Sequence, residues 1–404
     1  MKKTRFGYIV LLLIFLFPVS LGALDFGFLV NQYLGYGNSE DNNDYNFEYR
    51  IGFVPRLSFL VGDTGSFFTS GSMTFGYSNE FYYVPELLRT ELSMRFGALG
   101  LRAGRFNYSS PLPFIAEGLF DGIQFTHSSP AGRFGAGLWY TGLLYKKNIN
   151  ILMTEHDEEL YHSPLNYSNF SNTYFAPRRL FTSVDWEHPS IAEFVKLTAA
   201  FSGQMDLSGK DNRLHSQYLI LKTGIPVNNF LFEAGGSIGT AQYVDKIADD
   251  LDFNLAFAGE FGIYFILPTN FTSRFSFIGR FTTGIRDSDL LGAFNPITTK
   301  YYGEIFQQRM SGLTALTLNY SARLVESFGT SLTMSYFIRN GLAFGEENTN
   351  RLYGGEFCAQ FIWSPVSDLQ LGLGGGTFIP SMGNYWPDAK AQWRIVLTAV
   401  LAVF

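Results

Sequence analysis

The chain has 404 residues, with 29 lysines and arginines against 35 aspartates and glutamates, and a formal net charge of −6. Charged residues make up 16% of the chain and aromatic residues 17%, with 42 phenylalanines, 23 tyrosines and 42 glycines. The negative charge argues against a nucleic-acid partner, and a typical secreted soluble domain has more charge and fewer aromatic residues. The single cysteine, Cys358, excludes a disulfide framework and a lipid-modified N-terminal cysteine.

Residues 1–23 have the pattern of a cleaved secretory signal peptide. Lys2, Lys3 and Arg5 precede the apolar run Tyr8–Phe17, and small residues follow near position 22. An uncleaved membrane anchor is the alternative. Cleavage would remove three positive charges and leave a mature chain, residues 24–404, with a formal charge of −9.

From residue 24 onward, apolar and polar residues alternate with a period of two, and turn residues separate the alternating segments. The clearest segment is Leu87–Phe96. We expect about 18 strands, with 16 or 14 as alternatives. They lie near Leu24–Gly37, Tyr45–Gly62, Ser66–Ser78, Leu87–Phe96, Leu99–Asn107, Leu119–Ser128, Arg133–Tyr145, Arg179–Glu187, Ala192–Met205, Leu214–Pro226, Phe230–Tyr243, Leu251–Leu267, Phe271–Arg286, Gly312–Leu324, Thr330–Arg339, Arg351–Ser364, Leu369–Ile379 and Trp393–Phe404.

The separators alternate between tight turns and longer polar segments, and they include an aromatic loop expected at Asn79–Glu86. Two segments are much longer, Lys146–Arg178 and Asp287–Ser311, and Tyr301–Gln308 could extend a strand or form an extra hairpin. No apolar run after the signal approaches the roughly 20 residues that a transmembrane helix needs. The sequence therefore predicts an all-β fold, a single transmembrane antiparallel β-barrel with short periplasmic turns and longer extracellular loops.

The two faces of the predicted strands differ in polarity. A soluble β-sandwich has the same alternation and is the alternative to a lipid-facing barrel. We expect an outward apolar face formed by Phe253, Leu255, Phe257, Phe275, Phe277, Phe281, Leu332, Met334, Tyr336, Ile338, Phe357, Phe361 and Trp363. We expect an inward charged face formed by Glu48, Arg50, Arg56, Arg89, Glu91, Arg95, Arg102, Asp185, Glu187, Lys196, Glu233, Glu260, Arg274, Arg280, Arg323 and Glu356.

A cross-strand group of arginines facing acids could set the electric field at a pore constriction. Structural pairing of charges inside the barrel is the alternative for any one of these residues. Whether the segments 146–178 and 287–311 fold into the lumen and block it stays open. The candidate lumen and constriction residues are Arg89, Glu91, Arg95, Arg102, Glu260, Arg274, Arg280 and Glu356.

Other chemistry has little support in the sequence. The segment His156–His162 contains metal-ligand residue types, but its spacing matches no defined zinc signature, so a solvated acidic loop is the better interpretation. No serine, histidine and acid can be placed together as a catalytic set. We therefore expect no metal, no cofactor and no enzymatic activity.

The signal peptide, the unbroken series of amphipathic strands and the C-terminal strand ending in Phe404 resemble bacterial outer-membrane β-barrel proteins. In that family the final strand is the signal read by the barrel assembly machinery, which the resemblance assigns to Phe404. Thr398, Val400 and Ala402 are smaller than the residues usual on that face, which leaves the register of the last strand open. The segments Leu101–Arg105 and Phe120–Ile123 are similar to strands of large substrate-specific and alginate-export-type porins, and the phenylalanine-rich composition resembles spirochaetal proteins.

The resemblance implies a location in the cell outer membrane, contact with its lipid, and a porin-like channel that lets small solutes pass a polar lumen. A transporter of hydrophobic ligands such as fatty acids is one alternative, and a surface adhesin or structural barrel with a blocked lumen is another. The sequence leaves open which solute passes and whether the barrel forms a homotrimer.

Overall fold

The structure is a computed structural model that describes residues 24–403, apart from 39–44, 211, 246–249, 270, 285–291 and 342–348. The expected signal peptide and Phe404 lie outside the described residues, so their assignments stay predictions. None of the helices in the described part of the chain is long and apolar enough to cross a membrane.

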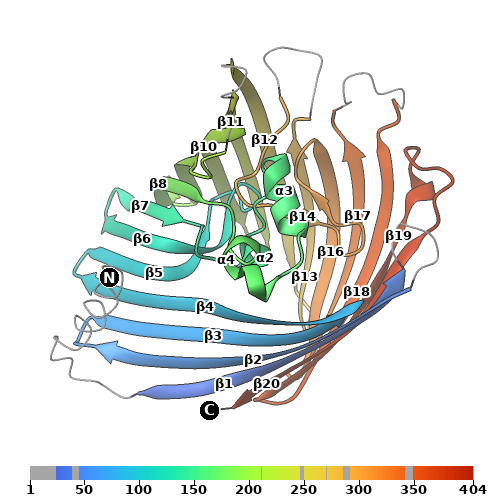
Figure 1. Cartoon of the computed structure of the whole chain (residues 1–404), viewed down its shortest axis with the longest axis horizontal. Coiled ribbons are helices and arrows are strands. Elements are labelled where there is room, and N and C mark those ends of the chain that lie inside the picture. Colours follow the sequence, from blue (N-terminus) through green and yellow to red (C-terminus); the bar gives the residue numbers. More distant parts are fainter. Residues whose placement is uncertain are drawn as a thin grey trace.

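One 18-stranded antiparallel sheet closes on itself (Figure 1). Each strand pairs with the next, and β20 pairs with β1 from Phe28–Val403 to Gly37–Arg394. The closed barrel and the expected number of strands are therefore confirmed. The strands are β1 (Asp25–Asn38), β2 (Tyr45–Val61), β3 (Gly65–Ser78), β4 (Glu80–Phe96), β5 (Leu99–Ser109), β6 (Glu117–Ser129), β7 (Gly132–Tyr140), β8 (Arg179–Ile191), β9 (Val195–Asp206), β10 (Asn212–Val227), β11 (Phe230–Asp245), β12 (Asp250–Leu267), β13 (Thr272–Thr282), β16 (Leu313–Val325), β17 (Phe328–Arg339), β18 (Leu352–Val366), β19 (Leu369–Ile379) and β20 (Gln392–Val403).

The alternation of turn lengths gives the barrel two different ends. The connections after β2, β4, β6, β8, β10, β12, β16 and β18 are all short, and they lie at the end where β1 begins and β20 finishes. The other connections lie at the opposite end, and most of them are longer. We call these the short-turn end and the long-loop end.

The prediction of a loop between β3 and the clearest strand segment is wrong. Residues 79–86 were predicted as an aromatic loop, but β4 already begins at Glu80 after a one-residue turn at Asn79. Asn79 has a φ of 64°, a left-handed conformation that asparagine tolerates better than most residues. Phe81 and Tyr83 pair with Tyr77 and Phe75, so the aromatic residues continue the ladder. Large rings on both strands stabilise such cross-strand pairs.

The outward face is apolar, as predicted. Trp363, Met334 and Leu332 are each nearly half exposed, and Phe253, Phe257, Phe275, Phe281 and Phe361 are also exposed. An outward apolar band of this kind fits the hydrocarbon region of a bilayer. The register of the last strand is resolved: Ile395, Leu397 and Leu401 are exposed on the outer surface. Val396 and Thr398 line an inner cavity.

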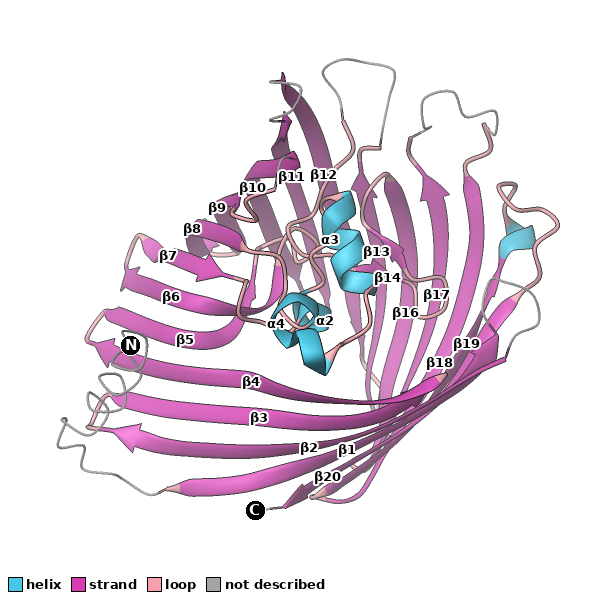
Figure 2. Ribbon diagram, in the orientation of Figure 1, coloured by secondary structure: helices cyan, strands magenta, loops and turns pink. Residues whose placement is uncertain are grey.

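The long connections contain short helices and a small hairpin. Figure 2 shows the helices between β7 and β8 within the space that the strands enclose. Of the two alternatives for Tyr301–Gln308, the extra hairpin is present. It consists of β14 and β15 and is separate from the barrel sheet. These elements are α2 (Lys146–Ile149), α3 (Glu155–His162), η1 (Tyr167–Asn169), α4 (Phe170–Thr173), β14 (Tyr301–Tyr302), β15 (Gln308–Arg309) and, between β19 and β20, η2 (Pro380–Met382).

The buried core lies inside the barrel. It joins apolar residues of the inner wall to apolar residues of the long connections, which together exclude water from part of the lumen. Its largest fully buried members are Phe106, Leu112, Phe114, Ile115, Phe120, Trp139, Phe181, Phe294, Phe337 and Phe378.

Candidate functional site

Three connections at the long-loop end pack together inside the barrel. They are the short insert (residues 110–116), the long insert (residues 141–178) and the crossing segment (residues 292–312). The Ile297 amide donates to the Ile115 carbonyl at 2.8 Å, which joins the crossing segment to the short insert. The Thr299 amide donates to the Asn150 carbonyl at 2.8 Å, which joins it to the long insert. The three segments therefore form one packed unit.

A buried charged group holds the long insert to the barrel wall. Arg179, the first residue of β8, contacts Asp157 of α3 at 2.5 Å and also pairs with Asp206 at the end of β9. All three side chains are almost fully buried. Burial raises the pKa of Asp157 above its usual range, although Arg179 acts in the opposite direction. The interpretation of this segment as a solvated acidic loop is wrong at Asp157, because Asp157 lies in a helix and is buried against Arg179. The group has one positive and two negative charges when both acids are ionised.

The long insert is also braced internally. The Lys146 ammonium donates to the Leu160 carbonyl at 2.8 Å and to the Ser163 carbonyl at 2.6 Å, which links α2 to the end of α3. Burial lowers the pKa of Lys146 to about 8. Thr154 and Asp157 form a capping box at the start of α3. The helices of the insert therefore hold each other in place.

The long insert replaces a missing strand partner along β4. The ladder between β4 and β5 ends at Thr90–Arg105, although β4 begins ten residues earlier at Glu80. The exposed carbonyls on this edge accept side-chain donors: Tyr167 donates to Tyr83, Tyr174 to Pro85 at 2.7 Å, and Arg105 to Leu87 at 2.6 Å. Burial raises the pKa values of Tyr167 and Tyr174 to about 12, which keeps both phenols protonated as donors.

The crossing segment reaches the opposite wall at residues 304–307, which we call the tip. The Glu356 carboxylate of β18 accepts backbone hydrogen bonds from Glu304 at 2.8 Å and from Ile305 and Phe306 at 2.9 Å. The Phe306 ring stacks on Phe378 with a centroid separation of 4.2 Å. The lumen is therefore crossed by a segment that is anchored at both ends.

Three cavities follow one another along one side of the lumen, and each shares lining residues with the next. The upper cavity, of about 320 Å³, lies among the ends of β1, β2 and β20 at the long-loop end and reaches Ile305 and Gln307 of the tip. The middle cavity, of about 350 Å³, shares Ile305, Gln307 and Arg394 with it. The lower cavity, of about 590 Å³, shares Ser331 and Gln360 with the middle one and reaches Glu326 and Ser327 in a turn of the short-turn end. We call this series the side passage.

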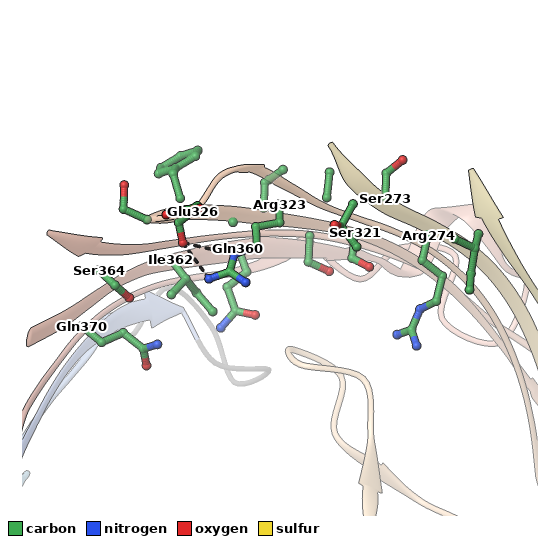
Figure 3. A pocket seen from close by; sticks show the side chains of 17 residues that line it. Ser273, Arg274, Ser321, Arg323, Glu326, Gln360, Ile362, Ser364 and Gln370 are labelled. Carbon is green, nitrogen blue, oxygen red and sulfur yellow. Dashed lines mark hydrogen bonds between the residues drawn. The ribbon is translucent and has the colours of Figure 1, made fainter. Parts of the chain in front are cut away.

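The side passage carries arginines that lack carboxylate partners. The Arg50 guanidinium lies 4.1 Å from the centre of the Tyr33 ring, and no described carboxylate pairs with it. Arg274 likewise has no ion pair within the described chain, and Figure 3 shows its side chain pointing away from the wall into the lower cavity. Arg323 donates to the Glu326 backbone carbonyl at 2.8 Å. Arg394 is paired with Glu48 at 2.7 Å. Most of the remaining lining side chains are neutral.

The other side of the lumen has a cavity that ends at the apolar core, which we call the closed cavity. It has a volume of about 360 Å³ and lies toward the short-turn end, between β5 and β11. Tyr108 and Pro111 line it, and Leu112 of the short insert, a member of the apolar core, lies close to Gly235. Its ionisable residues are largely paired with one another, including Lys196 with Glu187 at 3.1 Å and Lys222 with Glu233 at 3.3 Å. No described cavity continues it through the core.

The predicted site residues fall into separate groups. Glu91 lies between Arg89 at 2.5 Å and Arg102 at 2.7 Å on β4 and β5. Glu260 pairs with Arg280 at 2.7 Å, and the Arg280 guanidinium also lies 4.8 Å from the centre of the Tyr302 ring. Their role in a constriction stays a prediction.

The remaining predicted residues have different positions. Arg95 donates to the Gly97 carbonyl at the short-turn end, away from the inserts. Arg274 lines the lower cavity, whereas Glu356 holds the tip and is only 2% exposed. Arg50 is on the predicted inner face but is not among the candidate constriction residues. Arg394 is in neither set. The alternation of the last strand was the available signal for Arg394.

Comparisons with known proteins find solved structures with a similar fold but no family with a similar sequence. No protein-family model matches the chain, and no curated protein matches its sequence. Among solved structures, Pseudomonas aeruginosa OccK5 (OpdH) has a TM-score of 0.61 at 12% identity, over 94% of this chain and 98% of that one. Pseudomonas aeruginosa OccK2 (OpdF) in complex with glucuronate has a TM-score of 0.59 at 11% identity, over 94% and 98%.

Acinetobacter baumannii OccAB1 has a TM-score of 0.57 at 10% identity, over 94% of this chain and 97% of that one. At these identities the likeness concerns the fold alone. Because the matches span nearly the whole length of both chains, the chain has the closed 18-stranded barrel fold of the Occ outer-membrane channels.

Proposed function

We propose that the chain is an outer-membrane channel through which small hydrophilic solutes diffuse along the side passage. The observation that carries this proposal is the series of three cavities, each sharing lining residues with the next, from the long-loop end to the short-turn end, past the tip. The inserts fill the other side of the lumen with an apolar core, so the route is off-centre. A channel of this kind needs no chemistry beyond polar walls and a limiting width.

We further propose that the channel favours small anions. Arg50 and Arg274 face the side passage without carboxylate partners among the described residues, so their charge acts on the solute. Small sugar acids are a suitable solute class for such a wall, because a guanidinium binds a carboxylate and the neutral lining groups can bind hydroxyls. The structure of OccK2 in complex with glucuronate, a sugar acid, is consistent with this class.

Planar-bilayer recordings test both parts. We expect discrete conductance steps from the purified protein, and a reversal potential of the sign that anion preference gives across a potassium chloride gradient. Absence of conductance steps from correctly folded protein would refute the channel. A reversal potential of the opposite sign would refute the anion preference and leave the channel intact.

A further inference from the structure

Glu356 has surroundings unlike those of a pore-lining charge. It lies on the inner face of β18 but is only 2% exposed. Both carboxylate oxygens accept backbone hydrogen bonds from the tip, and the Cys358 thiol lies 3.6 Å away. No described cation lies within ion-pair distance of it. Successive backbone N–H groups that converge on one anion form a binding nest, so the tip stabilises the buried charge of Glu356.

The backbone of the tip is shaped to receive this carboxylate. Gly303 has a φ of 87°, and a Cβ atom built on it would lie 3.0 Å from Glu356 Oε2 and 3.0 Å from the Phe337 ring. Gln307 also has a positive φ, of 48°. The chain therefore turns sharply on each side of the three donors, and only glycine leaves room at the first turn.

An aromatic cradle fixes the same segment from the other side. Phe306 is 7% exposed and contacts Phe337 and Phe378, with ring-centroid separations of 5.1 and 4.2 Å. Tyr353 and Trp386 complete the cradle. Aromatic contacts of this kind stabilise the segment beyond the effect of the area that they bury. Anchored in this way, the tip keeps Ile305 and Gln307 on the border between the upper and middle cavities.

We infer that Glu356 is a positioning residue that sets the width of the side passage by holding the tip, and that it does not act as a selectivity charge. This inference rests on the proposed channel function. Ile305, Gln307 and Arg394 line both the upper and the middle cavity, and Gly374 and Gly375 line the middle one. Loss of the Glu356 carboxylate would release the tip and widen the passage there without adding a charge that faces the solute.

Two substitutions should release the tip by different means. Glu356→Ala removes the acceptor of three hydrogen bonds. Gly303→Val keeps the charge of Glu356 but places a branched side chain where a Cβ already comes within 3.0 Å of the carboxylate. The control is Glu304→Gln, because Glu304 lines the middle cavity, forms no ion pair with a described residue and holds the tip only through its backbone.

The measurements are single-channel conductance, the largest neutral polyethylene glycol that still lowers conductance, and the reversal potential. We expect Glu356→Ala and Gly303→Val to raise conductance and admit larger polymers. Glu356→Ala, which leaves no carboxylate at this position, should also keep the wild-type reversal potential. Glu304→Gln should keep the wild-type polymer cut-off. Heat-modifiable migration on gels identifies folded barrels, and either folded variant suffices for the test.

A conducting wild-type protein whose Glu356→Ala variant shifts the reversal potential with an unchanged polymer cut-off would overturn the inference, as would variants with no change in either property. A wild-type protein that does not conduct would refute the proposed channel itself, so the two failures are distinguishable.

Discussion

The hydroxyl group of Tyr174 donates a hydrogen bond to the carbonyl oxygen of Pro85 at 2.7 Å, across a break in the barrel wall. Pro85 has no N–H group, so only its carbonyl needs a partner on this edge. Figure 1 shows β4 continuing past the point where β5 turns away, with α2 and α4 near the break. The long insert is therefore part of the wall as well as part of the lumen filling.

Arg105 is the strongest of the contacts that close this break. It forms a bidentate pair with Asp121, at 2.7 and 2.9 Å, and donates to the Leu87 and Leu143 carbonyls. Arg105→Met would leave the Asp121 carboxylate without its cation, which costs about 3–5 kcal/mol when the pair is buried. Urea unfolding in detergent should show this loss. Wild-type stability in this variant would mean that the wall does not depend on the side-chain seal.

The hydrogen bond from Tyr174 to Pro85 should contribute less to stability than the Arg105 contacts. Tyr174→Phe removes one neutral hydrogen bond, which is worth about 1 kcal/mol. Tyr77→Phe is the matched control, because Tyr77 packs on Phe81 with ring centroids 4.9 Å apart but its hydroxyl donates to no described residue. The same unfolding experiment should rank Tyr174→Phe below Tyr77→Phe in stability. Equal stability of the two variants would contradict the role of Tyr174 in the seal.

The buried group around Arg179 should make stability depend on pH. Burial raises the pKa of Asp157, so the stabilisation from its protonated form is present at low pH and is lost as pH rises through the folded-state pKa. Asp157→Asn stays neutral at every pH. We therefore expect the stability of the variant relative to wild type to increase as pH rises from about 4, the ordinary pKa of an aspartate, to about 7. A relative stability that stays constant or falls over this range, measured by thermal unfolding, would contradict the charge balance assigned to this group.

Anion preference should depend on the unpaired arginines and not on the paired ones. Arg50→Gln and Arg274→Gln each remove a positive charge from the side passage, so the reversal potential should move toward cation preference. Arg102→Gln is the control, because Arg102 is bound to Glu91 at 2.7 Å and lines the closed cavity. A larger shift in the control than in Arg50→Gln would place the solute route on the other side of the lumen.

The strands could be predicted from the sequence because their pattern is local. Successive residues of a segment such as Arg89–Phe96 face lipid and lumen alternately, and the barrel wall keeps that period except at β-bulges such as the one at Leu88. The turn lengths then gave the number of strands and the two ends. The prediction failed at Asn79–Glu86, where consecutive aromatic residues hid the alternation of β4.

The interior could not be predicted in the same way. The contact of Glu356 with the amide of Phe306 joins residues 50 positions apart, and that of Arg309 with Glu158 joins residues 151 apart. No periodic pattern reports contacts of this kind, because they depend on how the inserts fold into the lumen. The position of Glu356 on the inward face of its strand could be predicted, but the backbone groups that bind it could not. The same holds for the burial of Asp157 by Arg179.

Solutes should pass along one side of the lumen only. Two glycines, one on each side, allow a matched test of this route. Gly374 lines the middle cavity and Gly224 lines the closed cavity, and at each the nearest atom to an added Cβ lies 3.9 Å away. In a Cys358→Ser background, cysteine placed at either position is treated with a bulky methanethiosulfonate reagent, and mass spectrometry confirms modification. We expect single-channel conductance to fall sharply for Gly374→Cys and to stay unchanged for Gly224→Cys. Full modification of Gly374→Cys without loss of conductance, or a block by modified Gly224→Cys, would contradict the account.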